Sequence, residues 1–224
     1  MTAATGCAVL PGVPDIPGRL LGYAGRRWGV RDDVFPADPG LNRWAIGPRA
    51  VQLRAGALEL SSHTDPDGPW GVELWTPIST PARLEFQVTP QGEGLHPDDV
   101  LGLFLYRDGR CEMDIELTRW GEARGPDTFH TFADRSGRAA RLGASTLRTR
   151  HALELSPTRV RLESQSRRGF AASDAELCGC AAGAHVLRVN LWRRDDQLRP
   201  PTRVHIEVKF AEPSHLTPWR DDAG

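Results

Sequence analysis

The sequence predicts an all-β fold, a two-sheet antiparallel β-sandwich with about a dozen short strands. Short apolar or alternating runs recur along the chain, and turns that contain Gly and Pro separate them. Helical periodicity never persists beyond a turn or two. No repeat, low-complexity run or linker divides the chain, so we expect a single domain over residues 19–212. Residues 1–18 are expected to form an irregular lead-in and residues 213–224 a polar tail.

The composition limits the possible partners and surroundings. A chain of 224 residues can bury a sizeable core within one large β domain. Its formal net charge of −1 gives no reason to expect nucleic acid or an anionic membrane, and no window approaches a membrane span in length. We expect a monomer. Residues 1–10 lack the basic region and long apolar run of a signal peptide, so the protein is cytoplasmic unless its export signal is missing from this sequence.

The first half of the domain reads as a series of short strands. Residues 22–31 are typical of an edge strand, and residues 35–44 form a loop because two prolines and a glycine interrupt them. Alternation on either side of Ala55-Gly56 predicts a hairpin of residues 49–54 and 57–61. Further strands are expected over residues 70–76 and 82–90.

The middle of the chain carries the strongest functional signal. Residues 100–106 are almost wholly apolar, which is typical of a strand buried on both faces, and Asp108-Gly109 predicts a tight hairpin turn. In the next strand, residues 111–117, acidic and apolar residues alternate. Successive side chains of a strand point to opposite faces, so three carboxylates share one face, namely Glu112, Asp114 and Glu116.

Three like charges along one strand repel one another, which suggests that they form a site. Retaining glycosidases place two carboxyl groups about 5–5.5 Å apart. On a flat strand Glu112 and Glu116 lie roughly 13 Å apart, and long side chains on a concave sheet can close much of that gap. Asp114 between them would raise the pKa of a flanking Glu, as an acid catalyst requires. The alternative is an amphipathic strand whose acidic face is simply solvated.

The second half of the domain continues the strand pattern. Residues 117–121 are expected to prolong the acidic strand, and residues 128–132 to form its neighbour. Residues 151–157 and 160–164 predict a hairpin, residues 166–184 a long loop, and residues 185–192 and 204–210 the last two strands. His151 is interpreted as a structural hydrogen-bonding residue rather than a catalyst.

The four cysteines match no zinc-binding pattern. They are Cys7, Cys111, Cys178 and Cys180. Cys178 and Cys180 are too close in sequence for an ordinary disulfide with each other, so free thiols are expected. Metal binding by that pair stays open as an alternative.

Several of these segments resemble glycoside hydrolase family 16, the laminarinase and lichenase group. The Glu-x-Asp-x-Glu pattern at residues 112–116 is similar to its catalytic strand, and residues 82–90 (Ala-Arg-Leu-Glu-Phe-Gln-Val-Thr-Pro) to another of its strands. Asn190-Leu-Trp192 and Pro200-Pro201 also match, and the resemblance extends over residues 22–212. It implies a jelly-roll, concanavalin A-like lectin/glucanase fold with a cleft on the concave face.

The resemblance also implies an activity and a set of site residues. Glu112 would be the nucleophile, Asp114 its supporting carboxylate and Glu116 the general acid/base of a retaining endo-hydrolase. The substrate would be a β-glucan-like polysaccharide or oligosaccharide, with no metal or organic cofactor required. Substrate-binding residues would be Asn42, Glu85, Asn190 and Trp192 from the family pattern, and Trp120 as a sugar-stacking ring. Trp44 is a further candidate for the cleft, although a packing role is an equal alternative for it, and packing also stays open for Trp120.

Two departures from the family pattern keep other functions open. Pro81 and Leu155 stand where the family has aromatic residues, so weak glycan binding is expected. One alternative is a catalytically weak or inactive carbohydrate-binding module on the same fold. The other is a purely structural or interaction sandwich with a solvated acidic strand.

Overall fold

The computed structural model describes residues 20–40, 42–45, 49–107, 111–132, 135–176 and 184–211. The expected lead-in, tail and Asp108-Gly109 turn lie outside these ranges. The described part is all-β, without a helix, and therefore offers no helix that could cross a membrane. Its strands are β1 Leu20–Tyr23, β2 Arg26–Val30, β3 Asp33–Ala37, β4 Asn42–Trp44, β5 Val51–Arg54, β6 Ala57–Asp65, β7 Gly68–Ser79, β8 Ala82–Pro90, β9 Asp99–Tyr106, β10 Glu112–Leu117, β11 Thr128–Phe132, β12 Arg135–Ala140, β13 Thr149–Leu155, β14 Arg159–Ser166, β15 Gly169–Glu176, β16 Ala184–Arg193 and β17 Thr202–Ala211.

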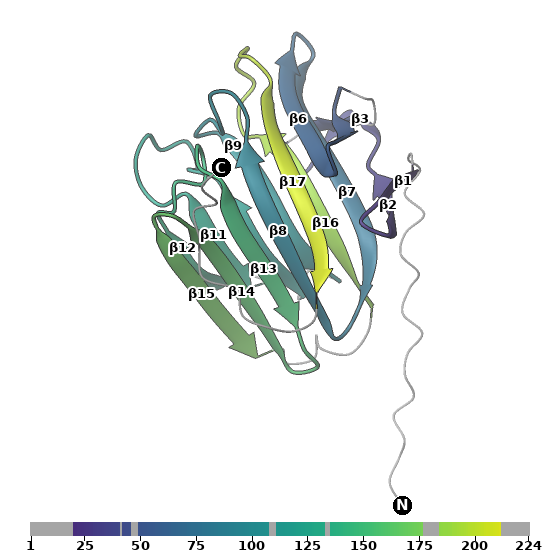
Figure 1. Cartoon of the computed structure of the whole chain (residues 1–224). Helices are drawn as coiled ribbons and strands as arrows, with labels where there is room; N and C mark the ends of the chain where they lie inside the picture. Colours follow the sequence, from purple (N-terminus) through teal and green to yellow (C-terminus); the bar gives the residue numbers. More distant parts are fainter. Residues whose placement is uncertain are drawn as a thin grey trace, which may run out of the picture.

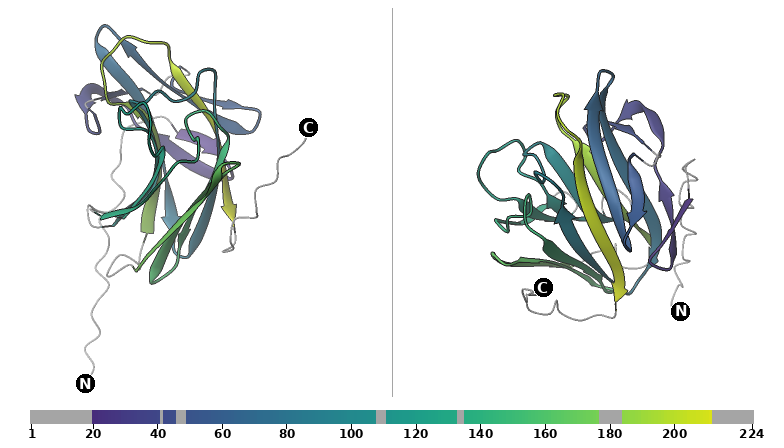
Figure 2. Two further views of the ribbon diagram at one scale, coloured as in Figure 1. Left: turned by 90° about the vertical axis from the view of Figure 1, so that its left-hand side faces the viewer. Right: turned by 45° about the horizontal axis from the view of Figure 1, so that its top comes forward.

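The strands form two layers, as the sequence predicted. Antiparallel pairing links one layer in the order β1-β2-β7-β16-β9-β10-β11-β12. The other layer runs β5-β6-β17-β8-β13-β14-β15 and lies in front in Figure 1. Figure 2 shows the same two layers from the side. The curved jelly-roll sandwich expected from the sequence is confirmed.

The core lies between the two layers and fixes the direction of the β10 side chains. Met113, Ile115 and Leu117 are each at most 1% exposed and join the main hydrophobic cluster. Burying an aliphatic side chain of this size stabilises the fold by about 1.5–3 kcal/mol. Because side chains alternate along a strand, the three acidic residues of β10 must point away from this core.

β9 is the central strand beside β10. It pairs with β10 on one side and β16 on the other, and residues 99–103 are all buried. The prediction of a strand buried on both faces is therefore confirmed for most of its length.

Three local predictions were wrong. Residues 35–44 were expected to be a loop, but β3 and β4 pair there at their ends around an irregular register. The expected loop 166–184 contains β15, an edge strand of small and polar residues in which Ala171 is well buried, so it shows no clear alternation. β10 ends at Leu117 instead of continuing to residue 121, and Trp120 further along adopts a left-handed conformation, with φ of 51°, that is incompatible with a strand.

The prediction of free thiols was also wrong for Cys111. This residue is 5% exposed and forms a disulfide whose partner lies outside the described residues. Cys7, Cys178 and Cys180 all fall outside those residues. Sequence spacing excluded a bond between the neighbouring pair but carried no information about a long-range partner for Cys111.

A buried polar network connects the layers. Ser164 Oγ lies 2.8 Å from His130 Nε2 and 2.8 Å from His151 Nδ1, and His151 Nε2 lies 2.7 Å from Thr149 Oγ1. Burial lowers the pKa of His130 to about 4 and that of His151 to about 3, so both rings are neutral at neutral pH. His151 is thus a structural hydrogen-bonding residue, as expected.

Candidate active site

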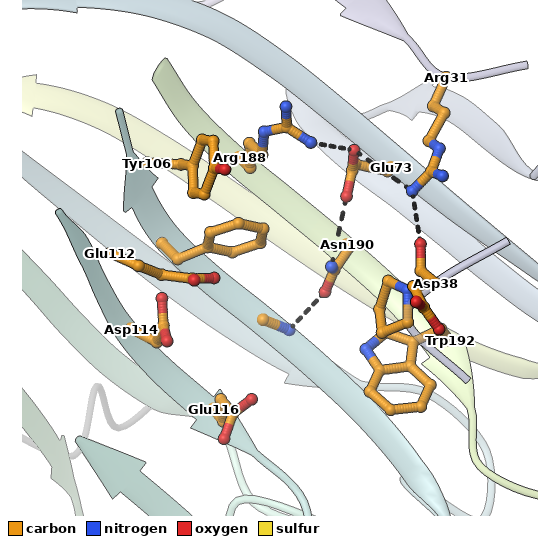
Figure 3. A pocket seen from close by; sticks show the side chains of 13 residues that line it. Arg31, Asp38, Glu73, Tyr106, Glu112, Asp114, Glu116, Arg188, Asn190 and Trp192 are labelled. Carbon is orange, nitrogen blue, oxygen red and sulfur yellow. Dashed lines mark hydrogen bonds and ion pairs between the residues drawn. The ribbon is translucent and has the colours of Figure 1, made fainter. Parts of the chain in front are cut away.

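A cavity of about 420 Å³ opens on the outer face of the sheet that contains β10. Residues of β7, β9, β10 and β16 form its floor and walls, and Arg31, Asp38 and Pro39 close one end. We call this cavity the cleft; its main side chains are shown in Figure 3.

The acidic wall of the cleft is the outward face of β10. Glu112, Asp114 and Glu116 all line the cavity, and their side chains are drawn along one strand in Figure 3. The pairing register places them opposite Tyr106, Phe104 and Gly102 of β9, respectively. One oxygen of Asp114 accepts a hydrogen bond from Thr131 Oγ1 at 2.8 Å, whereas Oδ1 is buried without a partner among the described residues.

Burial dominates the electrostatics of this wall. It raises the pKa of Asp114 to about 8 and that of Glu116 to about 7, and in both cases the charge of Glu112 adds to the rise. Burial also raises the pKa of Glu112, but the Arg188 guanidinium opposes that rise. The three groups therefore differ: Glu116 and Asp114 retain protons near neutrality, and Glu112 alone has a cation that favours its ionised form.

The opposite wall of the cleft is an ion-paired cluster around Glu73. This carboxylate is 1% exposed; it accepts a 2.7 Å hydrogen bond from Arg188 Nη1 and lies 3.9 Å from Arg31 Nη1. The Arg188 guanidinium also lies 5.1 Å from the centre of the Tyr106 ring. Figure 3 shows this cluster facing the β10 carboxylates across the cavity.

Gly102 forms the floor between the two walls. It sits directly between Glu116 on β10 and Asn190 on β16 in the pairing register. Its N–H donates to Asn190 Oδ1 at 3.1 Å, and a Cβ at this position would meet the same oxygen at 2.6 Å. Only glycine leaves the floor open here.

The predicted binding residues divide into two groups. Asn190 and Trp192 line the cleft. Trp120 lies beside it: its ring is 37% exposed and meets the Trp192 ring edge-on at 6.4 Å.

The other predicted positions lie elsewhere. Asn42 is fully buried and bonds the backbone of Arg193 with both ends of its amide. Trp44 is fully buried in a small cluster with Val100 and Trp192. Glu85 lies on β8 of the other layer and pairs with Arg83 at 3.1 Å.

Pro81 and Leu155, which stand where the family has aromatic residues, do not line the cleft. Leu155 is 1% exposed in the main core, and Pro81 lies in the turn between β7 and β8. The cleft itself contains the rings of Phe104, Tyr106 and Trp192. Pro81 and Leu155 therefore give no structural reason to expect weak glycan binding.

Comparisons with solved structures agree on one fold for this chain. No family model and no curated protein matches the sequence. Solved structures do match, among them a Bacillus licheniformis β-glucanase (TM-score 0.67, 13% identity, 88% of this chain and 100% of that chain). A non-specific endo-β-1,3(4)-glucanase from family GH16, SCLam, aligns with a TM-score of 0.61 at 12% identity over 88% and 85%. The chain has the fold of these β-glucanases.

A third match with this glucanase fold has a different description. It is an immunostimulatory antigen and pseudo β-1,3-glucanase of Mycobacterium tuberculosis, with a TM-score of 0.61 and 13% identity over 84% of this chain and 91% of that chain. The resemblance noted in the sequence is therefore confirmed at the level of the fold.

The wall around Glu73 was not predicted from the sequence. A signal was present, because the period of two that places Asn190 and Trp192 on one face of β16 also places Arg188 there. Glu73 alternates with apolar neighbours in β7 in the same way as the acidic residues of β10.

One group of described residues has the composition of a metal site. The ligand atoms of His96, Asp98 and Asp195 lie within 4.8 Å of one another. Each carboxylate already has a cation, since Arg194 lies 3.8 Å from Asp98 and Arg199 lies 2.6 Å from Asp195. These guanidiniums compete with a metal ion, and the group lies outside the cleft lining.

Proposed function

We propose that the protein is a retaining endo-glycoside hydrolase that acts on a β-glucan-like polysaccharide. The observation that carries this proposal is the β10 wall, where three carboxyl groups line one cavity and differ in their tendency to ionise. Paired carboxyl groups of unequal pKa are what retaining hydrolysis requires. The glucanase fold of the chain supports the substrate class.

The electrostatics favour one assignment of roles. Glu116 holds a proton near neutral pH and can donate it to the leaving glycosidic oxygen. Arg188 favours the ionised form of Glu112, as the nucleophile that attacks the anomeric carbon needs. After the glycosyl-enzyme forms, the ionised Glu116 takes a proton from the water that hydrolyses it. Asp114 lies between the two along β10 and is itself positioned by the hydrogen bond from Thr131 Oγ1.

The primary test uses azide to report which face each carboxyl group serves. In Glu112→Ala, activity should vanish, and azide entering the empty space should give a glycosyl azide of inverted configuration. In Glu116→Ala, a substrate with an activated leaving group should still form the intermediate, and azide should give the retained product. NMR of the anomeric proton distinguishes the two products.

The products of the two variants distinguish three possibilities for Glu112 and Glu116. Exchanged stereochemistry in the two variants would reverse the roles of Glu112 and Glu116. Wild-type activity in both alanine variants would show that the triplet is a solvated acidic face. Circular dichroism of both variants controls for loss of fold, which we do not expect because neither side chain enters the core.

A carbohydrate-binding module without turnover is the second candidate. It is favoured by the match to the pseudo β-1,3-glucanase. Reducing-sugar assays on β-1,3-glucan, mixed-linkage glucan and galactan, together with calorimetry on the same oligosaccharides, separate the candidates. Binding without any release of reducing ends would support the module and contradict the hydrolase.

A further inference from the structure

A second cavity, also of about 420 Å³, lies over β5, β6 and the start of β17. It shares no lining residue with the cleft. Its volume falls within the about 300–1,000 Å³ that is usual for small-molecule sites.

The lining of this cavity is strongly cationic. Four arginines line it, namely Arg49, Arg54, Arg199 and Arg203, against a single acid, Glu59, among the described lining residues. Gathering guanidinium groups in one concavity raises the local positive potential and attracts anions.

Two of these arginines are already neutralised. Arg54 Nε lies 3.2 Å from Glu59, whose other oxygen lies 2.7 Å from His205. Arg199 bonds Asp99 at 2.8 Å and also pairs with Asp195.

Arg49 and Arg203, by contrast, have no ion pair or hydrogen bond from their side chains within the part of the chain that the structure describes. The cavity therefore holds two uncompensated positive charges.

Neutral donors lie beside these charges. Ser61 is directly opposite Arg203 in the β6–β17 register and is 8% exposed. His63, two residues further along the same face of β6, stacks on the Trp70 ring at 6.0 Å with an interplanar angle of 6°. Neither side chain has a hydrogen-bond partner among the described residues.

We propose that this cavity is a binding site for a tetrahedral oxyanion, the phosphate or sulfate ester group of a sugar. Arg49 and Arg203 provide charge-assisted hydrogen bonds from two sides, and Ser61 and His63 supply further N–H or O–H donors. A cavity of about 420 Å³ is larger than one oxyanion and leaves room for the attached sugar ring. The site shares no lining residue with the β10 cleft; the choice of a sugar as the carrier of the oxyanion rests on the proposed function, whereas the oxyanion site itself does not.

The test is an NMR titration of the folded full chain with five probes: inorganic phosphate, inorganic sulfate, glucose 6-phosphate, glucose 6-sulfate and glucose. We expect saturable shifts of amides in residues 59–64 and 199–205 with the esters, and none with glucose. Whichever ester binds more tightly identifies the source of the oxyanion. The Arg49→Gln/Arg203→Gln variant should bind at least about tenfold more weakly.

Arg159→Gln is the matched control, because it removes one exposed positive charge outside the cavity. Its affinity should equal that of the wild type, and thermal unfolding of all variants checks the fold. Equal losses in the control and in the double variant would overturn the proposal, since they would indicate a general effect of charge. Absence of saturable shifts in the wild type, or shifts centred on the β10 cleft, would also overturn it.

Discussion

The two walls of the cleft contain the same chemical group in opposite electrostatic settings. Asp114 and Glu116 are half-buried and their carboxyl groups have no ion-pair partner among the described residues; desolvation raises their pKa values to about 8 and about 7. Glu73, across the cavity, is almost fully buried but lies against two guanidiniums. The difference teaches that burial alone does not mark a reactive carboxyl group. A buried acid whose charge is left uncompensated can exchange protons near neutral pH, whereas a compensated one is a structural anchor.

The comparison predicts opposite effects on function and stability. Glu116→Gln should lower kcat on β-glucan by about 10²–10⁴-fold, because it removes the proton donor. At pH values above 7 the same exchange should raise the free energy of unfolding relative to the wild type, since the wild type must ionise a half-buried, desolvated carboxyl group there. Steady-state kinetics and urea unfolding at pH 8 measure the two effects. Unchanged activity would remove Glu116 from the reaction.

Glu73→Gln should instead destabilise the fold by about 2–3 kcal/mol, less than the cost of breaking a fully buried ion pair because the Arg188 side chain is 20% exposed. The exchange removes the carboxylate that accepts the 2.7 Å hydrogen bond from Arg188. Urea unfolding measures the loss. In Glu73→Gln/Arg188→Gln the unpaired charge is gone, so part of the stability should return. A single variant as stable as the wild type would show that the cluster is not an anchor.

Asp114→Asn should change how stability depends on pH. The pKa of Asp114 is 3.8 in the unfolded chain and about 8 in the fold, so between these values the folded protein keeps a proton that the unfolded chain releases. Wild-type stability therefore falls as pH rises through this window. The Asp114→Asn variant has no ionisable group at this position, so its stability lacks this dependence on pH.

The stability of Asp114→Asn relative to wild type should accordingly increase by about 2–4 kcal/mol from pH 5 to pH 8. Unfolding curves at several pH values measure it. A difference that is constant with pH would mean that Asp114 ionises normally and that the acidic wall is solvated.

Trp120→Ala should have the smallest effect. The ring lies at the edge of the cleft, outside both walls, and its loss should weaken oligosaccharide binding by about 1 kcal/mol while kcat changes little. Calorimetry with a short β-glucan oligosaccharide checks this. Leu198→Ala is the control, as Leu198 is 72% exposed and outside the cleft lining. Equal effects of the two exchanges would assign Trp120 to packing.

Sequence patterns predicted which side chains share one face of a strand, because this depends only on the period of two. They did not predict contacts between segments that are far apart in the sequence. The alternation in residues 112–117 was enough to place three carboxyl groups on one face, because one face of β10 had to enter the core. No local pattern shows that Asn42 is needed to bond the backbone of Arg193.

Long-range pairing also explains the other missed features. β15 is held by its hydrogen bonds to β14 and by one buried alanine, which leaves little hydrophobic signal in its sequence. The position of the Glu73 cluster relative to β10 depends on the strand order β7-β16-β9, which no local sequence pattern reveals.

Gly102 has a consequence for how this protein can change over evolution. A single methyl group there would press on Asn190 Oδ1 and occupy the space between Asn190 and Glu116, leaving every carboxyl group in place. One codon change would thus reshape the floor of the cleft while its acidic signature survived unaltered. For any descendant of this chain, the residue at position 102 reports on the shape of that floor, which the acids alone do not.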